Sequence, residues 1–410
     1  MSASQLRIAM LSVHSCPIGN LGAKDTGGMS VYIRELAREL GKQGFLVDVY
    51  TRVHDPKDNQ IVTLGQNARL IHLKAGEDED MHKLAVYSYL PDFTCNLENF
   101  RKHNYLRYDL AFSHYWLSGW VGKYLQQWWN IPHVTMFHTL GAVKNDVGIG
   151  EDEPELRIET ERYLARNCHH IIATTEKEKE ELIVYYGTSP ERISVIPCGV
   201  NLELFQPMDK KMAKQQLGFG DDKIILFVGR IEPLKGIDQL LEAMTYLQNS
   251  QGLRLVIIGG DEHSQYEMKR LQRLSQELHI QGSVTFLGLI EQEKLPCFYS
   301  AADVCVIPSY YESFGLVALE SIACGTPVVA TNVGGLKSVI HQGETGYVVT
   351  DNTPSHLADK IALLLSKPSP DKKTTLSIRA SVTQFSWSNI AQATIRECRL
   401  VLADYFAPVH

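Results

Sequence analysis

The chain has 410 residues, of which 44% are hydrophobic and 21% charged. This length and composition suffice for two or three domain-sized cores, which excludes a mainly disordered protein. Forty lysines and arginines stand against 47 aspartates and glutamates, so the net charge is −7 and the basic excess typical of nucleic-acid binders is absent. No apolar run approaches the roughly 20 residues of a membrane helix, and residues 1–7 do not resemble a secretory signal. Eight cysteines form no Cys-x-x-Cys pair, which predicts reduced thiols, no metal site and a cytoplasmic protein.

The first half of the chain alternates between short apolar runs and helical patterns. Residues 6–13 are partly β-branched and flanked by polar residues, which predicts a buried parallel strand. A helical stripe covers 28–42, and the next strand is expected at 45–51. Further strands are expected at 108–114, 132–138, 169–173 and 192–196, with helices from about 117, at 155–166 and from 176. This alternation predicts a parallel sheet covered on both faces.

The helix from 176 has its own start signal. Thr175, with Glu178 three residues later, is a capping-box pattern. Charges alternate in sign over 176–181, which favours a solvated helix face.

A second alternating series follows a segment, 197–211, that has few regular signals and contains two prolines. We therefore predict an N-terminal domain over 1–200 and a C-terminal domain over 201–386, each a doubly wound α/β fold that can carry ligand loops at the carboxyl ends of its strands. The tail over 387–406 predicts one amphipathic helix. The second domain is expected to have strands at 223–228, 253–258, 284–287, 303–307 and 327–330, and helices at 237–248, 265–279, 291–300 and 315–323.

Two loops combine glycines or cations with the end of a strand. The loop over 14–26 is longer than most strand-to-helix connections and delivers Gly27-Gly28 to a helix start, where free amides favour an anion. A plain Gly-Gly hinge is the alternative.

After the first strand of the second domain, Arg230 is followed five residues later by Lys235. Two cations on one such loop suit a diphosphate, although they could also be surface charges.

The segment from Tyr311 to Glu320 is the strongest local signal. Glu312 and Glu320 flank a predicted helix start at which the amides of Phe314, Gly315 and Leu316 would favour a second anion. The two carboxylates could accept hydrogen bonds from sugar hydroxyls, act as a glycosidase pair, or simply be exposed. His138 ends a predicted strand in the first half of the chain, opposite the other loops; a structural histidine is the alternative there.

Together these features resemble the retaining GT-B glycosyltransferases. The supporting motifs are Gly229-Arg230 with Lys235-Gly236, and the Glu-x7-Glu pair of 312 and 320. Within that family, the segments 25–32, 113–119 and 138–145 are similar to the sucrose-synthase and sucrose-phosphate-synthase group, and most similar to the D-inositol-3-phosphate glycosyltransferases of mycothiol synthesis. The resemblance covers nearly the whole chain.

The resemblance implies two Rossmann-like domains facing across a cleft, with residues 387–410 crossing back to the first domain. It implies that Gly27, Gly28, Arg230, Lys235 and the amides of Gly315 and Leu316 approach the donor diphosphate. Glu320 would hold the ribose, Glu312 the transferred sugar and His138 the sugar near its 6-hydroxyl, with Phe314 beside them. The uracil would lie near Arg230 and pair with the backbone of Ile290. Catalytic roles would fall to His138, Arg230, Lys235 and Glu312.

On the acceptor side, the resemblance aligns Lys83, Tyr115, Thr139 and Arg157 with residues that hold the inositol phosphate. Read without it, Lys83 and Arg157 could be solvated surface cations. The sequence departs from the mycothiol enzymes at Gly141, where they have alanine, and over the acidic segment 148–155.

The expected reaction is retaining transfer of a hexosyl group, glucose or N-acetylglucosamine, from a UDP-sugar to a hydroxyl acceptor, with a phosphorylated polyol or sugar or a growing polysaccharide or glycolipid chain as acceptor. The UDP-sugar is the donor substrate, and no cofactor, metal, nucleic acid or integral membrane segment is expected; a homodimer is compatible with the chain. The alternatives are a hydrolase that uses Glu312 and Glu320, a catalytically inactive sugar-nucleotide binder, and a nucleotide-sugar epimerase.

Overall fold

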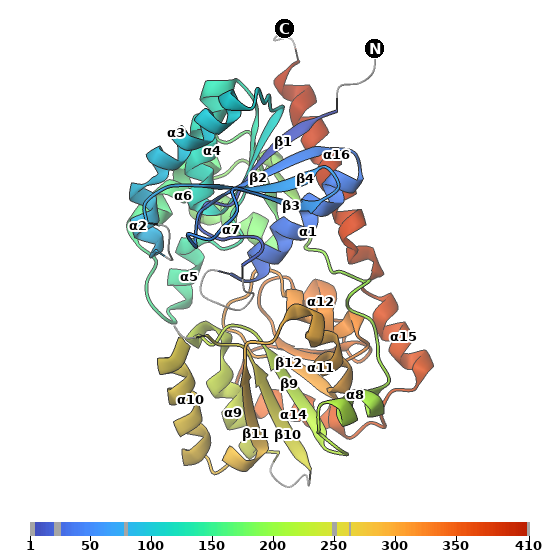
Figure 1. Ribbon diagram of the computed structural model, residues 1–410. Helices are drawn as coiled ribbons and strands as arrows, with labels where there is room; N and C mark the ends of the chain where they lie inside the picture. The colour runs from blue at the N-terminus through green and yellow to red at the C-terminus, as the bar shows by residue number, and fades with distance from the viewer. Residues whose placement is uncertain (1–4, 20–25, 78–80, 248–251, 262–263, 408–410) are drawn as a thin grey trace.

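The computed structural model describes residues 5–19, 26–77, 81–247, 252–261 and 264–407 as two α/β domains stacked on one another (Figure 1). Each domain is built on one sheet. The first sheet has the strand order β3-β4-β2-β1-β5-β6-β7-β8 and the second the order β11-β10-β9-β12-β13-β14. All pairs are parallel except β3 with β4. Two doubly wound domains were predicted, and the structure has them.

In the first domain, helices cover both faces of a sheet whose central strands are buried. β1 is apolar from Ile8 to Leu11 and almost fully enclosed, as expected of a parallel strand with helices on both faces. The strands are β1 (Arg7–Leu11), β2 (Leu46–Arg52), β3 (Ile61–Gly65), β4 (Ala68–Leu73), β5 (Leu110–His114), β6 (His133–Met136), β7 (His170–Ala173) and β8 (Ile193–Val195). The helices are α1 (Gly28–Lys42), α2 (Lys83–Ser88), α3 (Leu90–His103), α4 (Tyr115–Trp129), α5 (Gly141–Val147), α6 (Glu155–Asn167) and α7 (Glu176–Tyr186).

The second domain repeats this arrangement on a smaller sheet. Its strands are β9 (Lys223–Val228), β10 (Leu253–Ile258), β11 (Val284–Gly288), β12 (Val304–Ile307), β13 (Val328–Thr331) and β14 (Gly346–Val349). Its helices are α8 (Lys210–Gln216), α9 (Ile237–Thr245), α10 (Gln265–Glu277), α11 (Leu295–Ala301), α12 (Leu316–Ala323), α13 (Leu336–Val339), α14 (Pro354–Leu365) and α15 (Lys372–Ala380). Short 3-10 helices include η2 (Pro233–Lys235) and η5 (Gln292–Lys294). The domain limits at 200 and 386 stay a prediction.

The last helix, α16 (Trp387–Tyr405), leaves the second domain and runs along the first, beside α1 (Figure 1). The two chain segments that cross between the domains are joined: Val200 pairs with Ser386 in a parallel bridge, and its N–H donates to the Phe385 carbonyl at 2.8 Å. The crossing-back helix was predicted. No helix within the described ranges is long and apolar enough to cross a membrane.

The predicted solvated face over 176–181 is wrong at Glu178, which is buried. Thr175 caps α7 by accepting from the Glu178 N–H at 2.9 Å, as the capping-box pattern predicted. The Glu178 carboxylate accepts from the N–H and hydroxyl of Thr174 instead of from the cap residue, at 2.7 and 2.6 Å. These two bonds to Thr174 hold the Glu178 side chain in the interior, and burial raises the pKa of its carboxyl group.

Candidate active site

A cleft of about 400 Å³ lies between the two domains, lined by loops that follow strands of both sheets. Every residue to which the sequence assigned a site role lines this cleft, although Asp25, part of the motif over 25–32, is outside the described residues. The structure thus brings the predicted donor and acceptor residues together, while the role of each stays a prediction. These lining residues are Gly27, Gly28, Lys83, Tyr115, His138, Thr139, Arg157, Arg230, Lys235, Ile290, Glu312, Phe314, Gly315, Leu316 and Glu320.

The two cations of the second domain each face a carboxylate. Lys235 Nζ lies 2.6 Å from Glu312 Oε2, and Arg230 Nη2 lies 3.0 Å from Glu232 Oε1. Burial would raise the pKa of Glu232, but Arg230 and Lys235 outweigh it and lower that pKa. Gly236 permits the turn after Lys235, because its φ is 63° and a Cβ would stand 2.1 Å from the Pro308 carbonyl oxygen.

Two helix N-termini converge on the cleft. α1 begins at Gly28, where a Cβ would lie 3.2 Å from Leu316 Cδ1 at the start of α12 in the other domain. Gly315 caps α12 with a φ of 95°, a conformation that favours glycine. Amides of the first helical turn have no partner within the helix, so both starts suit negatively charged groups.

Glu320 lies one α12 turn deeper and is nearly enclosed. It accepts a hydrogen bond from the Tyr299 hydroxyl at 2.8 Å. Burial raises the pKa of Glu320 to about 7, although bonds from Tyr299 and Gln292 act in the opposite direction. Gln292 in turn accepts from Arg34 Nη2 of the first domain at 2.6 Å, so the two domains share this hydrogen-bond chain.

His138 is two residues beyond β6, which ends at Met136, so the prediction that this histidine ends a strand is wrong by two residues. Its φ of 62° is uncommon for a residue with a side chain and costs roughly 1–3 kcal/mol, an arrangement that the surroundings must hold. Its Nε2 lies 2.9 Å from Nδ1 of the buried His114. Burial lowers the pKa of His138 to about 3, so this side chain is neutral near pH 7.

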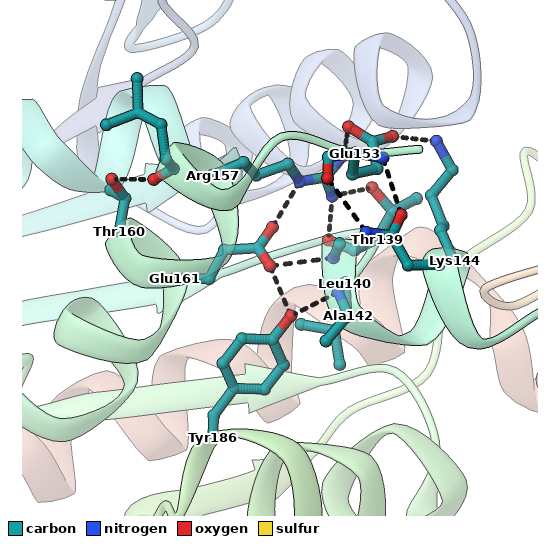
Figure 2. Close-up of polar contacts among 12 residues, drawn as sticks. Thr139, Leu140, Ala142, Lys144, Glu153, Arg157, Thr160, Glu161 and Tyr186 are labelled. Carbon is teal, nitrogen blue, oxygen red and sulfur yellow. Dashed lines mark hydrogen bonds and ion pairs between the residues drawn. The ribbon is translucent and has the colours of Figure 1, made fainter. Parts of the chain in front are cut away.

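On the first-domain side, Arg157 is buried, so the surface-cation alternative is wrong for this residue. Figure 2 shows its guanidinium among acceptors: Nε lies 2.7 Å from Glu161 Oε1, and Nη2 lies 2.9 and 3.0 Å from the carbonyl and hydroxyl oxygens of Thr139. The guanidinium also lies over the Tyr115 ring, 4.8 Å from its centroid. Lys83 lies over the same ring at 5.7 Å. Thr139, Tyr115 and both cations therefore form one wall.

The acidic segment over 148–155 contributes one residue to this wall. Glu153 Oε2 lies 2.8 Å from Arg157 Nη1, and its other oxygen accepts from Lys144 (Figure 2). Burial would raise the pKa of Glu153, but Arg157 and Lys144 hold it at about 2. Gly141 makes room for this network, because a Cβ there would lie 3.1 Å from Arg157 Nε.

Two family models match the chain over most of its length: residues 26–204 match "Glycosyltransferase Family 4", and residues 209–380 match "Glycosyl transferases group 1". The chain belongs to these glycosyltransferase families. It is 37% identical to a D-inositol 3-phosphate glycosyltransferase of Corynebacterium glutamicum, with 94% of each chain covered. A D-inositol 3-phosphate glycosyltransferase of Catenulispora acidiphila is 38% identical, over 96% of this chain and 95% of that protein.

Solved structures place the glycosyltransferase in the GT-B fold. A sucrose-phosphate synthase from Thermosynechococcus elongatus superposes with a TM-score of 0.90 at 35% identity, covering 98% of this chain and 100% of that one. The lipopolysaccharide glycosyltransferase WaaG has a TM-score of 0.69 at 16% identity, over 96% and 99% of the two chains, and shows the shared fold alone. The predicted family and the predicted GT-B architecture are both confirmed.

Sequence reasoning missed several polar residues of the glycosyltransferase's cleft. Glu232 and Gln292 line it but stand at the starts of short 3-10 helices that have no pattern of their own. Lys144 lies within the segment 138–145 and was given no role. His114, which contacts His138 but does not itself line the cleft, was named only as part of a motif, because this contact depends on tertiary structure.

Proposed function

We propose that this glycosyltransferase moves a hexosyl group, glucose or N-acetylglucosamine, from a UDP-sugar to a hydroxyl acceptor with retention of configuration. The observation that carries the proposal is the meeting of two cations, two helix N-termini and two carboxylates in one interdomain cleft. Cations and amides suit a diphosphate leaving group, and the carboxylates of Glu312 and Glu320 suit sugar hydroxyls.

In the proposed reaction, the bond between the anomeric carbon and the donor phosphate oxygen breaks, and its electron pair leaves with UDP. The acceptor oxygen bonds to the anomeric carbon on the same face, and its proton passes to a donor phosphate oxygen. Arg230, Lys235 and the amides at Gly315 and Leu316 stabilise the developing charge, because groups fixed before the reaction need not reorganise during it. No protein nucleophile is required.

The carboxylate pair fits the hydrolase alternative poorly. A glycosidase needs one protonated carboxyl group as general acid next to a second carboxylate. The Glu312 carboxylate is held by Lys235 at 2.6 Å. The raised pKa of Glu320 would suit an acid, but its carboxylate is buried beneath the α12 start and bound by the Tyr299 hydroxyl at 2.8 Å, a setting better suited to binding than to proton transfer.

Mass spectrometry of products from mixed UDP-sugars and an acceptor panel, followed by NMR of the anomeric configuration, tests the proposal. We expect a glycoside with the anomeric configuration of the donor, plus UDP. Free sugar released at the transfer rate without acceptor would identify a hydrolase. Epimerised donor among the products would identify an epimerase, and tight UDP binding without turnover would identify a catalytically inactive binding protein. A product of inverted configuration would refute retention.

For the acceptor we propose a phosphorylated polyol or sugar. Two relatives at 35–37% identity are named for D-inositol 3-phosphate and sucrose phosphate. In this chain, Lys83 and Arg157 line the cleft beside the hydroxyl groups of Tyr115 and Thr139. Cations and hydroxyls together suit a phosphate, since charge-assisted hydrogen bonds are roughly twice as strong as neutral ones.

Lys83→Ala is the cleanest test of this pocket. Arg157→Ala would leave the buried Glu161 without its cation, and breaking such a pair costs about 3–5 kcal/mol. We expect phosphorylated acceptors to outcompete their unphosphorylated forms on the wild-type protein, and Lys83→Ala to erase that preference while UDP affinity is kept. Lys57→Ala, an exposed lysine outside the cleft, is the control. Equal rates for both forms of every acceptor would shift the proposal to a neutral sugar or a polysaccharide chain.

A further inference from the structure

His114 and His138 form a hydrogen-bonded pair of imidazoles, of which only His138 lines the cleft. Nδ1 of His114 lies 2.9 Å from Nε2 of His138. His114 is fully enclosed, whereas His138 keeps 9% of its surface exposed and lines the cleft. Burial lowers the pKa of both rings, so each carries one proton near pH 7 and the contact between them holds one proton.

Two arrangements of the protons satisfy that contact. In the first, His114 Nδ1–H donates to His138 Nε2, and His138 carries its own proton on Nδ1. In the second, His138 Nε2–H donates to His114 Nδ1, and the proton of His114 is on Nε2. The first arrangement leaves a lone pair on His114 Nε2 and a proton on His138 Nδ1. The second leaves a proton on His114 Nε2 and a lone pair on His138 Nδ1.

The surroundings of His114 decide between them. Its Nε2 is buried and has no hydrogen-bond partner within the described part of the chain. The rings of Phe112 and Tyr32 lie 4.5 and 5.8 Å from the His114 ring, so aromatic surface surrounds it. The second arrangement would place an unpartnered N–H there, a situation that is rare in proteins, whereas the first leaves only an unpartnered lone pair. The first arrangement is therefore favoured.

We propose that His114 is a positioning residue that holds His138 in the tautomer with its proton on Nδ1, so that His138 acts as a hydrogen-bond donor to a substrate oxygen in the cleft. His138 Nδ1 has no partner among the described residues, and the Tyr32 ring stands edge-on to the imidazole at 5.2 Å. The contact with His114 also fixes the ring at a residue whose backbone has a φ of 62°. The catalytic meaning of this donor rests on the proposed transfer reaction; the location of the proton does not.

Long-range ¹H–¹⁵N NMR of the ligand-free protein tests the tautomer directly. The His138 signals are assigned by their loss in His138→Asn. We expect a protonated Nδ1 and an unprotonated Nε2 on His138, and the same pattern on His114. A His138 proton on Nε2 would overturn the proposal, whether or not the protein turns over any donor.

Two variants test the role of the contact. The amide of His114→Asn can donate from nearly the same place as Nδ1, whereas His114→Phe keeps a ring and loses the donor. With UDP release from UDP-glucose and UDP-N-acetylglucosamine as the readout, we expect His114→Phe to lower kcat about tenfold with little change in KM, the effect of one lost hydrogen bond. His114→Asn should recover most of that loss.

Equal losses in the two variants would show that His114 fills space only and would overturn the positioning role. If His114→Phe fails to fold, the wild-type tautomer and His114→Asn still decide the matter. A wild-type protein that releases no UDP from either donor and transfers to no acceptor would refute the proposed function, while the NMR result on the proton would stand.

Discussion

Arg230 and Lys235 bring their charges to the cleft in different settings. The Arg230 side chain is 43% exposed, while that of Lys235 is 16% exposed and paired with Glu312. Little packing depends on the Arg230 side chain, whereas Lys235→Ala also leaves the Glu312 carboxylate without its cation. We expect Arg230→Ala and Lys235→Ala each to lower kcat about 10²- to 10³-fold with saturating donor, the usual effect of removing one fixed donor to developing charge.

The matched control for these two variants is Arg254→Ala. Arg254 belongs to the same domain, pairs with Asp222 at 2.8 Å and does not line the cleft. Its loss should leave turnover unchanged. A folded Arg230→Ala or Lys235→Ala protein with near-normal kcat would show that the leaving group is stabilised elsewhere.

Glu320 predicts a pH dependence of stability. Burial raises the pKa of its carboxyl group to about 7 in the folded protein, from an ordinary value of 4.5. Between these values the folded state holds a proton that the unfolded state has released, so stability falls as pH rises through this window and is level above it. The loss amounts to about 3 kcal/mol, an order-of-magnitude figure.

Glu320→Gln removes that ionisation but keeps an oxygen that can accept from Tyr299. We therefore expect the free energy of unfolding of the variant, measured with urea, to rise relative to that of wild type as the pH increases from about 5 to about 8. The total relative gain should be up to about 3 kcal/mol. UDP affinity should weaken at the same time if Glu320 holds the ribose as proposed, because a neutral amide then replaces the carboxylate. Parallel pH profiles for the two proteins would show that Glu320 is not the group responsible.

The residues that the sequence placed in the site share a local signal. Gly27-Gly28, Arg230, Lys235 and the Glu312–Glu320 segment each stand next to the end of a recognisable strand or the start of a helix, and parallel strands bring such ends to one edge. Gln292 and His114 also stand at such ends, at the start of the predicted helix 291–300 and at the end of the predicted strand 108–114, but this position alone gave neither of them a role. Their partners, Arg34 and His138, come from other parts of the chain, so their roles depend on tertiary contacts that no local pattern encodes.

At the scale of elements, most parallel strands were predicted from short apolar or β-branched runs, including the partly exposed edge strands β8 and β11. β3 and β4 were not predicted: β3 is an antiparallel edge strand, partly exposed along its length, and the apolar run of the buried β4 is interrupted by Arg69 and His72. The helices α2, α3, α5, α8, α14 and α15 and the strand β14 were also missed. The helices lie on the outside of the sheets, where only one face is apolar and the periodic signal is weaker, and β14 is the edge strand of the second sheet.

The attachment of α16 depends on its first residue. Trp387 is buried, its ring lies 5.3 Å from Tyr32, and a Cβ on Gly199 would stand 2.5 Å from its indole. We expect Trp387→Ala to lower the free energy of unfolding by about 3–5 kcal/mol, as large-to-small changes of buried aromatics do. Urea unfolding measures this.

Leu400→Ala on the same helix is the comparison. Leu400 is 58% exposed, and its truncation should stay within about 0.5 kcal/mol of wild type. Because Tyr32 contacts both Trp387 and His138, Trp387→Ala should also reduce turnover in protein that remains folded. Equal stability losses in the two variants would contradict the view that Trp387 anchors the helix.

At the scale of the whole molecule, Arg34 links the first domain to the donor side of the cleft through Gln292 at 2.6 Å, although Arg34 itself does not line the cleft. We expect UDP-sugar to favour the state in which this contact is made, as substrate-driven closure does in other two-domain enzymes. Small-angle scattering should show a more compact wild-type protein with saturating donor, and Arg34→Ala should need several-fold more UDP for the same effect.

Arg38→Ala provides the control for that experiment. Arg38 lies one turn further along α1 and bonds within its own domain, to Glu35 at 3.1 Å and to the Leu64 carbonyl at 2.8 Å. Its removal should leave the UDP dependence of compaction unchanged. Identical wild-type scattering curves with and without donor would mean that the cleft does not close.

The joined crossings at Val200 and Ser386 have a mechanical consequence. Two bodies connected by a single flexible strand can twist, slide and tilt, whereas two strands fastened side by side leave mainly rotation about the line they share. We therefore expect the domains to move mainly by this rotation, so that each opening carries the first-domain wall along nearly the same path over the second domain. A single protease cut in either crossing would keep the domains tethered through the other segment but would release the lost degrees of freedom.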